Sequence, residues 1–329
     1  MLNPILAVIG GFIFLVWGAD RFVVGAAATA RNLGVSPLVI GLTIVGFGTS
    51  APEMLVSGVA SWQGNPGLAV GNAIGSNITN IALILGLTAL IAPLSVNSRI
   101  LRRELPLLLV VMLAGLALLL DGDLSRLDGT LLLSGLLALV FWMVRTGLKD
   151  RDGDPLGTEF STEIPREMTM GRALFWVGLG LLVLLLSSRL LVWGAVAIAE
   201  SLGVSDLIIG LTIVALGTSL PELAASLVSA LRGEPDIAVG NVIGSNLFNL
   251  LAVLGLPGLI SPLAIEGAVL TRDYPVMIGL TVAFILMAYG LRGPARIDRL
   301  EGGLLLACYA GYQALLYFDT LGDTLGTGA

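Results

Sequence analysis

Two long segments of this chain repeat each other. With one fixed offset of 169 residues and no gap, residues 40–87 match residues 209–256 at 27 of 48 positions. Weaker matches at the same offset continue outward, for example Arg103 with Arg272. Self-similarity of this kind is typical of a fold built from copies of one structural unit. We therefore expect one duplicated architecture.

Composition indicates that the duplicated unit lies in a membrane. Apolar residues make up 56% of the chain and charged residues 12%, with a mean hydropathy of +0.96. Soluble domains average about a quarter charged residues. Apolar stretches of about 20 residues can cross roughly 30 Å of hydrocarbon. They lie near residues 4–28, 37–62, 68–92, 104–121, 128–146, 172–198, 206–231, 237–261, 273–291 and 299–318. The sequence therefore predicts an all-α polytopic membrane protein with ten transmembrane helices.

The ten spans divide into a first five-helix repeat at residues 1–146, a cytoplasmic loop at 147–171 and a second five-helix repeat at 172–329. Cytoplasmic loops collect Lys and Arg. Thirteen of these residues follow odd-numbered spans, against Arg126 and Arg272 on the other side. Both termini are thus expected to be extracytoplasmic. Because each repeat has an odd number of spans, the second copy enters the membrane with inverted topology.

The chain has few side chains that bind soft metals. It contains no histidine and a single cysteine, Cys308. The commonest ligand of zinc, copper and non-haem iron is therefore missing, and an internal disulfide is excluded. The formal charge of −6 gives no support for a nucleic-acid partner. A bound cation has to be held by oxygen atoms.

The first repeated motif is GTSAPE at residues 48–53 and GTSLPE at 217–222. A proline one residue before each glutamate has no N–H for the carbonyl four residues back, so we expect a helix break there. Freed carbonyls are costly in lipid unless something satisfies them, and a hard cation can do so. Membrane Ser and Thr ordinarily bond back to the preceding turn. A mid-membrane carboxylate costs about 2.5–3.5 kcal/mol, so Glu53 and Glu222 indicate a cation site.

The second repeated motif is GNAIGSNITN at residues 71–80 and GNVIGSNLFN at 240–249. Asn72, Ser76 and Asn80 are four residues apart and form one polar stripe. We expect this stripe to face the glutamates. The two glycines of each copy, one turn apart, are expected to let another helix approach closely.

The paired GTS-x-PE and GN-x-IGSN-xx-N segments closely resemble the alpha-repeats of the Ca²⁺/cation antiporter superfamily, specifically its bacterial and archaeal sodium/calcium exchanger branch. The resemblance covers both alpha-repeats, residues 40–87 and 209–256. It implies the sodium/calcium exchanger fold, with four cation sites at the centre. It also implies that two long tilted helices, spans 1 and 6, slide past the other eight.

The resemblance implies ligand roles for single residues. Glu53 and Glu222 would bind both Ca²⁺ and Na⁺, with main-chain carbonyls added by Thr49 and Thr218. The flanking Na⁺ sites would be lined by Ser50, Ser76, Ser219 and Ser245, and the middle position by Asn80 and Asn249. Potassium-dependent relatives carry an acidic residue at the last of these positions. The asparagine therefore argues against K⁺ dependence.

These features predict a secondary antiporter, not an enzyme, that exchanges Ca²⁺ for Na⁺ by alternating access. The two carboxylates give a core of formal charge −2, and an empty core of that charge is penalised in low dielectric. Exchange should therefore be obligatory. The alternative is a Ca²⁺/H⁺ antiporter that titrates the same glutamates, although such relatives typically carry GN-xx-E and not GTS-x-PE. A gated channel or a membrane scaffold explains the duplicated polar centre less well.

The remaining expectations concern the surroundings of the core. Membrane lipid and the transported ions are the expected partners, with no cofactor and no obligate protein partner, so a monomer is expected. The chain fits a bacterial inner membrane. Asp20, Arg21 and Arg189 are interpreted as snorkelling toward the surface. An EF-hand-like spacing of acidic residues in the 147–171 loop is attributed to chance.

Overall fold

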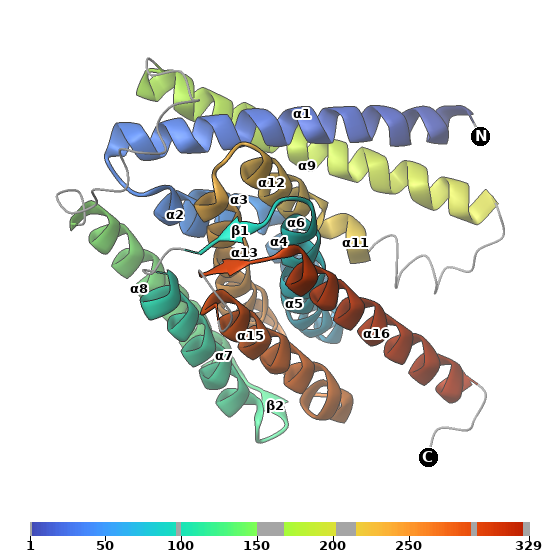
Figure 1. The fold of residues 1–329 in the computed structure, drawn as a ribbon. Coiled ribbons are helices and arrows are strands. Elements are labelled where there is room, and N and C mark those ends of the chain that lie inside the picture. Colours follow the sequence, from blue (N-terminus) through green and yellow to red (C-terminus); the bar gives the residue numbers. More distant parts are fainter. Residues whose placement is uncertain (1, 97–99, 150–167, 202–214, 291–294, 325–329) are drawn as a thin grey trace.

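The computed structural model describes residues 2–96, 100–149, 168–201, 215–290 and 295–324. Helices occur at each of the ten predicted segments (Figure 1). In the first repeat the elements are α1 (Leu2–Leu33), α2 (Pro37–Ile40), η1 (Gly41–Val45), α3 (Gly46–Thr49), α4 (Ala51–Trp62), α5 (Pro66–Thr79), η2 (Asn80–Leu85), α6 (Gly86–Ile91), β1 (Leu94–Ser95), η3 (Ile100–Glu104), α7 (Leu105–Leu119), β2 (Asp123–Leu124) and α8 (Arg126–Lys149). The elements named η are π-helical turns.

In the second repeat the elements are α9 (Met170–Ser201), α11 (Ala215–Thr218), α12 (Leu220–Leu231), α13 (Pro235–Phe248), η7 (Asn249–Val253), α14 (Gly255–Ile260), β3 (Leu263–Ala264), η8 (Val269–Asp273), α15 (Tyr274–Ala288), β4 (Arg296–Ile297) and α16 (Arg299–Thr324). From α4 and α12 through α7 and α15, matching helices begin 169 residues apart. Both α5 and α13 begin at a proline. Proline suits this position because the backbone N–H groups of a helix's first turn have no acceptor within the helix. The predicted duplication is confirmed.

Six of the described helices are long and apolar enough to cross a membrane. They are Leu2–Leu33, Pro66–Ile91, Arg126–Met143, Met170–Ile198, Pro235–Ile260 and Val269–Ala288. A seventh span results if Pro37–Thr49 and Ala51–Trp62, bent by 42° at a short break, count as one. Large apolar side chains are exposed on the outside, including Trp62 at 83% exposure. The protein is an all-helical, multi-pass membrane protein.

Two short strand pairs join loops that the predicted topology places on the same side of the membrane. Strand β1 pairs antiparallel with β4, Leu94 opposite Ile297, and β2 pairs with β3, Asp123 opposite Ala264. The first pair joins the loops after predicted spans 3 and 9, and the second joins those after spans 4 and 8. Because β1 and β3 occupy the same repeat position, each pair is the counterpart of the other, as inverted repeats require.

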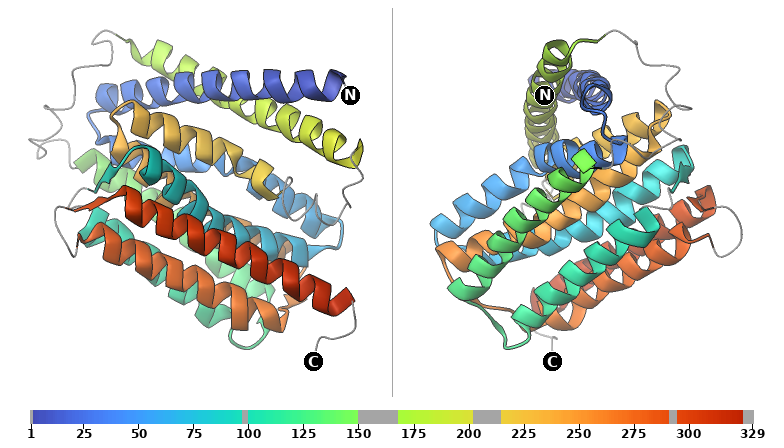
Figure 2. Two further views of the ribbon diagram at one scale, coloured as in Figure 1. Left: turned by 45° about the vertical axis from the view of Figure 1, so that its right-hand side comes forward. Right: turned by 90° about the vertical axis from the view of Figure 1, so that its left-hand side faces the viewer.

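Helices α1 and α9 lie side by side across one face of the other helices (Figures 1 and 2). Their backbones approach closely at glycines. A Cβ on Gly180 would lie 2.5 Å from the backbone nitrogen of Phe22, and one on Gly25 would lie 2.7 Å from that of Val177. Lipid provides no hydrophobic driving force for helix association. Small residues compensate by letting two helices approach closely enough for extensive van der Waals contact. The pair therefore packs backbone to backbone.

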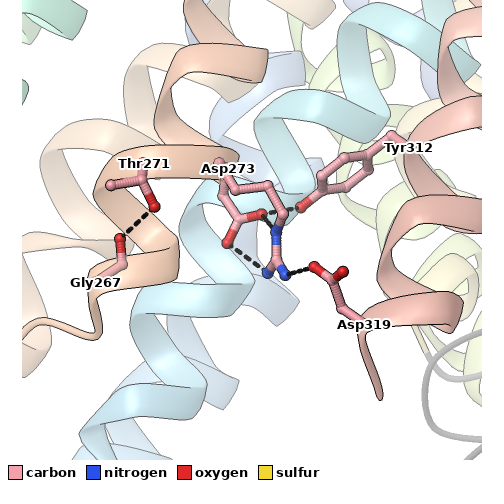
Figure 3. Close-up of polar contacts among 6 residues, drawn as sticks. Gly267, Thr271, Asp273, Tyr312 and Asp319 are labelled. Atoms are coloured by element: carbon pink, nitrogen blue, oxygen red, sulfur yellow. Dashed lines mark hydrogen bonds and ion pairs between the residues drawn. The ribbon is translucent and has the colours of Figure 1, made fainter. Parts of the chain in front are cut away.

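An ion-pair cluster fastens the start of α15 to the end of α16 (Figure 3). The Arg272 guanidinium contacts Asp319 of α16 at 2.6 Å and the adjacent Asp273 at 2.7 Å. The Tyr312 hydroxyl donates to Asp273 at 2.9 Å. Each charged group in the cluster has a partner, so we interpret it as structural.

Candidate functional site: an oxygen cage between the repeats

Each GTS-x-PE motif lies at a break between two helices. Between α3 and α4 the break is at Ser50 (φ −81°, ψ 3°), and between α11 and α12 it is at Ser219 (φ −91°, ψ 5°). A proline in the first turn of the following helix can donate no hydrogen bond one turn back. The predicted break is confirmed, and it places Glu53 and Glu222 in the first turn after it.

The two glutamates are enclosed by protein. Glu53 is 0% exposed and Glu222 is 2% exposed, and as carboxylates they are close enough to repel each other. In the described part of the chain, neither forms an ion pair with a Lys or Arg. The Ser50 hydroxyl donates to Glu222 Oε1 at 3.2 Å. Both carboxylate oxygens of Glu53, and Oε2 of Glu222, have no hydrogen-bond donor.

An asparagine holds the backbone of each glutamate in the same way. The Asn72 side-chain amide donates to the Glu53 carbonyl, and that of Asn241 donates to the Glu222 carbonyl, both at 3.2 Å. The predicted polar stripe therefore faces the glutamates. The asparagines themselves were not among the predicted ligands. Their four-residue spacing from Ser76 and Ser245 is the sequence signal that identifies them.

Hydroxyl and amide groups of one repeat contact those of the other. The Thr49 hydroxyl donates to Asn241 Oδ1 at 3.1 Å and lies 3.4 Å from the Ser245 hydroxyl. The Asn80 amide donates to Asn246 Oδ1 at 3.0 Å. Both motifs of both repeats thus contribute to one polar centre, as an inverted repeat predicts.

Two asparagines begin π-helical turns beside the glutamates. Turn η2 starts at Asn80 and packs against α12, which carries Glu222; turn η7 starts at Asn249 and packs against α4, which carries Glu53. Isolated π-turns inside helices often occur at functional sites. The sequence pattern gave no sign of these turns. Their effect is to bring an amide from each repeat next to the other repeat's glutamate helix.

Five buried acceptor oxygens in this centre have no donor. Beside the three carboxylate oxygens, they are Oδ1 of Asn80 and Oδ1 of Asn249. Buried polar atoms are rarely left without partners in proteins. Among the described residues, no three or more Asp, Glu, His or Cys side chains are placed to hold one metal ion together, so neutral oxygens must complete any ligand set. A cage of carboxylate, amide and hydroxyl oxygens suits a hard cation, which takes about 6–8 oxygens when it is Ca²⁺.

The other predicted ligands occupy less uniform surroundings. Ser76 is buried and donates to Asn72 Oδ1 at 3.4 Å. Ser245 reaches the Gly46 carbonyl at 3.5 Å, and Ser219 is buried at its helix break. Thr218 is only half-buried, whereas its counterpart Thr49 is fully enclosed. The two halves of the cage are therefore not equivalent.

The predicted glycine packing is confirmed in the second repeat. A Cβ on Gly244 would lie 2.5 Å from the Leu42 carbonyl oxygen, and one on Gly240 would lie 2.9 Å from that of Leu38. In the first repeat, no described atom lies within 4 Å of the corresponding positions. Their expected partner segment, 207–211, lies outside the described residues, so that prediction stays untested. The acidic residues of the EF-hand-like spacing in the 147–171 loop also lie outside them.

Asp20, interpreted as snorkelling toward the surface, has a charged partner that the sequence did not indicate. Its carboxylate pairs with the guanidinium of Arg232, in the turn between α12 and α13, at 2.7 Å from Nε. Arg21, next to it, lies over the Trp176 ring of α9 at 5.3 Å. The sequence could not identify the Arg232 pair because the two residues are 212 positions apart.

A buried oxygen cage at the interface of two inverted helical repeats is the arrangement typical of membrane transporters that bind cations. A family model described as sodium/calcium exchanger protein matches residues 3–145 and 172–318. The chain belongs to this family, in its bacterial and archaeal branch. It is thus a membrane-embedded cation antiporter.

Individual relatives agree over nearly their full length. The putative antiporter CaxA of Alkalimonas amylolytica is 51% identical over 96% of this chain and 99% of its own. Inner membrane protein YrbG of Escherichia coli is 43% identical over 97% and 98%. A solved structure of the sodium-calcium exchanger NCX_Mj, soaked with Na⁺ and Ca²⁺, superposes with a TM-score of 0.81 at 34% identity, covering 94% of this chain and 97% of that one.

Proposed function

We propose that this protein exchanges Ca²⁺ for Na⁺ across the bacterial inner membrane by alternating access, without K⁺. The observation that carries the proposal is the set of five donor-free buried oxygens, two of them on Glu53 and one on Glu222. In this proposal Ca²⁺ and Na⁺ compete for that pair of carboxylates. The family membership and the name of NCX_Mj support the choice of ions.

The proposed ligand set keeps the assignments drawn from the resemblance. The two glutamates bind both ions, and the Thr49 and Thr218 carbonyls complete the Ca²⁺ site. The flanking Na⁺ sites use the serine hydroxyls, Ser50, Ser76, Ser219 and Ser245, and the middle position uses Asn80 and Asn249. One Ca²⁺ neutralises two carboxylates, whereas three Na⁺ leave a charge of +1. With that stoichiometry, exchange is electrogenic.

Purified protein in liposomes tests the coupling ion. Uptake of ⁴⁵Ca²⁺ should follow an outward Na⁺ gradient, persist when the pH gradient is collapsed, and remain unchanged when K⁺ is replaced by choline. Liposomes that carry the protein with both glutamates replaced by glutamine provide the background. Uptake that follows the pH gradient and ignores Na⁺ would replace the proposal with Ca²⁺/H⁺ exchange through the same carboxylates.

The proposed orientation places both termini outside the cytoplasm and needs no protein partner. A C-terminal alkaline phosphatase fusion should be active and a C-terminal green fluorescent protein fusion dark. The reverse pattern would invert the topology. Light scattering of the purified protein should give the mass of one chain.

A further inference from the structure

A serine of α9 reaches the second helix break. The Ser188 hydroxyl donates to the main-chain carbonyl of Gly217 at 2.9 Å, in a buried position. Gly217 lies four residues before Pro221, so its carbonyl is the one that the proline leaves without a helical N–H. From the sequence, we expect a bound cation to satisfy such freed carbonyls. In the second repeat a hydroxyl from α9 satisfies the carbonyl instead.

The fit between α9 and this break is close. A Cβ on Gly217 would clash with the Val192 side chain, one turn along α9 from Ser188. The break itself lies at Ser219, and Glu222 follows in the first turn of α12. A bond to Gly217 therefore acts on the backbone that directs the second glutamate into the cage.

The first repeat lacks an equivalent hydroxyl. At the repeat offset of 169 residues, Ala19 of α1 takes the place of Ser188, and Gly48 takes the place of Gly217. Ala19 is fully buried but has no hydroxyl to donate. The α1–α9 pair can therefore satisfy one freed carbonyl with a side chain and not the other.

We propose that Ser188 is a positioning residue that stabilises one of the two facings of the exchanger. The inference rests on the proposed alternating access, in which two inverted repeats exchange conformations. In the opposite facing, α1 meets the first break as α9 now meets the second, and Ala19 offers no bond there. A hydrogen bond that forms in just one of the two facings shifts the equilibrium between them by the free energy of that bond.

Three variants separate this role from simple packing. Ser188→Ala removes the donor in the present facing, whereas Ser188→Thr keeps a hydroxyl. Ala19→Ser adds a donor for Gly48 in the opposite facing. Loss in one repeat and gain in the other should therefore shift the populations in the same direction, which a merely structural serine does not predict.

The populations are measured by pulsed electron paramagnetic resonance, independently of transport. Spin labels replace the exposed Trp193 of α9 and the exposed Trp62 at the end of α4, with Cys308 changed to serine. A net hydrogen bond corresponds to a change of roughly 2- to 12-fold in a population ratio. We expect a shift of about fivefold for Ser188→Ala and for Ala19→Ser, and none for Ser188→Thr.

An unchanged distance distribution in both Ser188→Ala and Ala19→Ser would overturn the inference. If Ser188→Ala fails to fold, Ala19→Ser decides alone: a shift away from the present facing supports the role, and no shift rejects it. Failure of the proposed function is a separate result, because it is read as missing Na⁺-driven ⁴⁵Ca²⁺ uptake in the unmodified protein.

Discussion

At the scale of single residues, the cage combines full burial with missing donors. Glu53 accepts no hydrogen bond at either carboxylate oxygen, and Glu222 accepts one, from Ser50. A buried carboxylate in that state is neutralised by a bound cation or by a proton. In the proposed exchange the transported cation supplies that charge, so its binding would also stabilise the core.

Replacing either glutamate should remove most of the ion binding. For Glu53→Gln or Glu222→Gln we expect apparent Ca²⁺ affinity to fall by roughly 100-fold or more, because changes just outside a metal's ligand shell already cost 10–100-fold. Isothermal titration with Ca²⁺ and liposome uptake measure the loss. The exposed Glu266 provides the matched control, since Glu266→Gln should retain both. Full Ca²⁺ flux in both cage variants would reject the site.

The Ser50 hydroxyl is a neutral proposed ligand that also donates to Glu222, so its removal should have a smaller effect than removal of a carboxylate. Ser50→Ala takes one hydrogen bond from the carboxylate, and we expect a 2- to 12-fold change in apparent Na⁺ affinity. In Thr43→Ala the lost hydroxyl only donates to the Val39 carbonyl one turn back, at 2.6 Å, so transport should stay near that of the unmodified protein. Equal effects of the two variants would contradict a specific role for Ser50. Na⁺ dependence of ⁴⁵Ca²⁺ uptake is the measurement.

At the scale of elements, broken helices and a close-packed helix pair shape the site. The proline-containing breaks place each glutamate at the start of a helix, and the π-helical turns at Asn80 and Asn249 bring amides beside them. Helices α1 and α9 pack through glycines. The Ser188–Gly217 bond and the Asp20–Arg232 ion pair join this pair to the other helices.

Adding one methyl group at the α1–α9 seam should separate the pair. A Cβ at Gly180 would lie 2.5 Å from the Phe22 backbone nitrogen, and overpacking of this kind typically costs 1–3 kcal/mol. Gly180→Ala should therefore lower the thermal unfolding temperature in detergent and slow exchange. Gly178→Ala, two residues away with no atom within 4 Å, should be neutral or slightly stabilising because alanine is the better helix former. An unchanged Gly180→Ala protein would mean that the seam tolerates separation.

At the scale of the whole molecule, the two repeats are alike in sequence but not in contact. Ser50 reaches across to Glu222, yet no described hydroxyl donates to Glu53. Charge is unequal too: the turn before α13 contains Arg232 and Glu234, whereas the turn before α5 contains Gln63 and Asn65. The two repeats are therefore not interchangeable in their contacts, and in the proposed alternating access the two facings would differ in energy.

Glu234 should make stability depend on pH. Burial raises its pKa from the ordinary 4.5 to about 7; the charge of Asp236 adds to the rise, and that of Arg31 opposes it. The folded protein thus binds this proton more tightly than the unfolded chain. The stabilising contribution is complete below about pH 4.5 and is lost as pH rises through about 7.

Thermal unfolding between pH 4.5 and 8 checks this dependence. The unmodified protein should lose more stability over that range than Glu234→Gln, whose side chain does not titrate. Glu266→Gln, at an exposed position, should follow the unmodified protein. Parallel curves for all three proteins would mean that the buried carboxyl does not carry the dependence.

The sequence by itself determined that the chain lies in a membrane, that it is duplicated, where the helices break, and that a glutamate follows each break. These follow from properties that are local along the chain: hydropathy over about 20 residues, a proline's missing N–H and the cost of an acidic residue in hydrocarbon. It also placed Asn72, Ser76 and Asn80 on one face, because a four-residue spacing fixes that face in any helix.

Only the tertiary structure decided which half of the cage makes which contact. The Ser50–Glu222, Ser188–Gly217 and Asp20–Arg232 contacts join residues 172, 29 and 212 positions apart. Two near-identical motifs cannot specify which of them makes each contact, because both satisfy the same local rules. The contacts are decided where packed helices bring together side chains that differ between the repeats, such as Ser188 opposite Gly217 and Arg232 opposite Asp20.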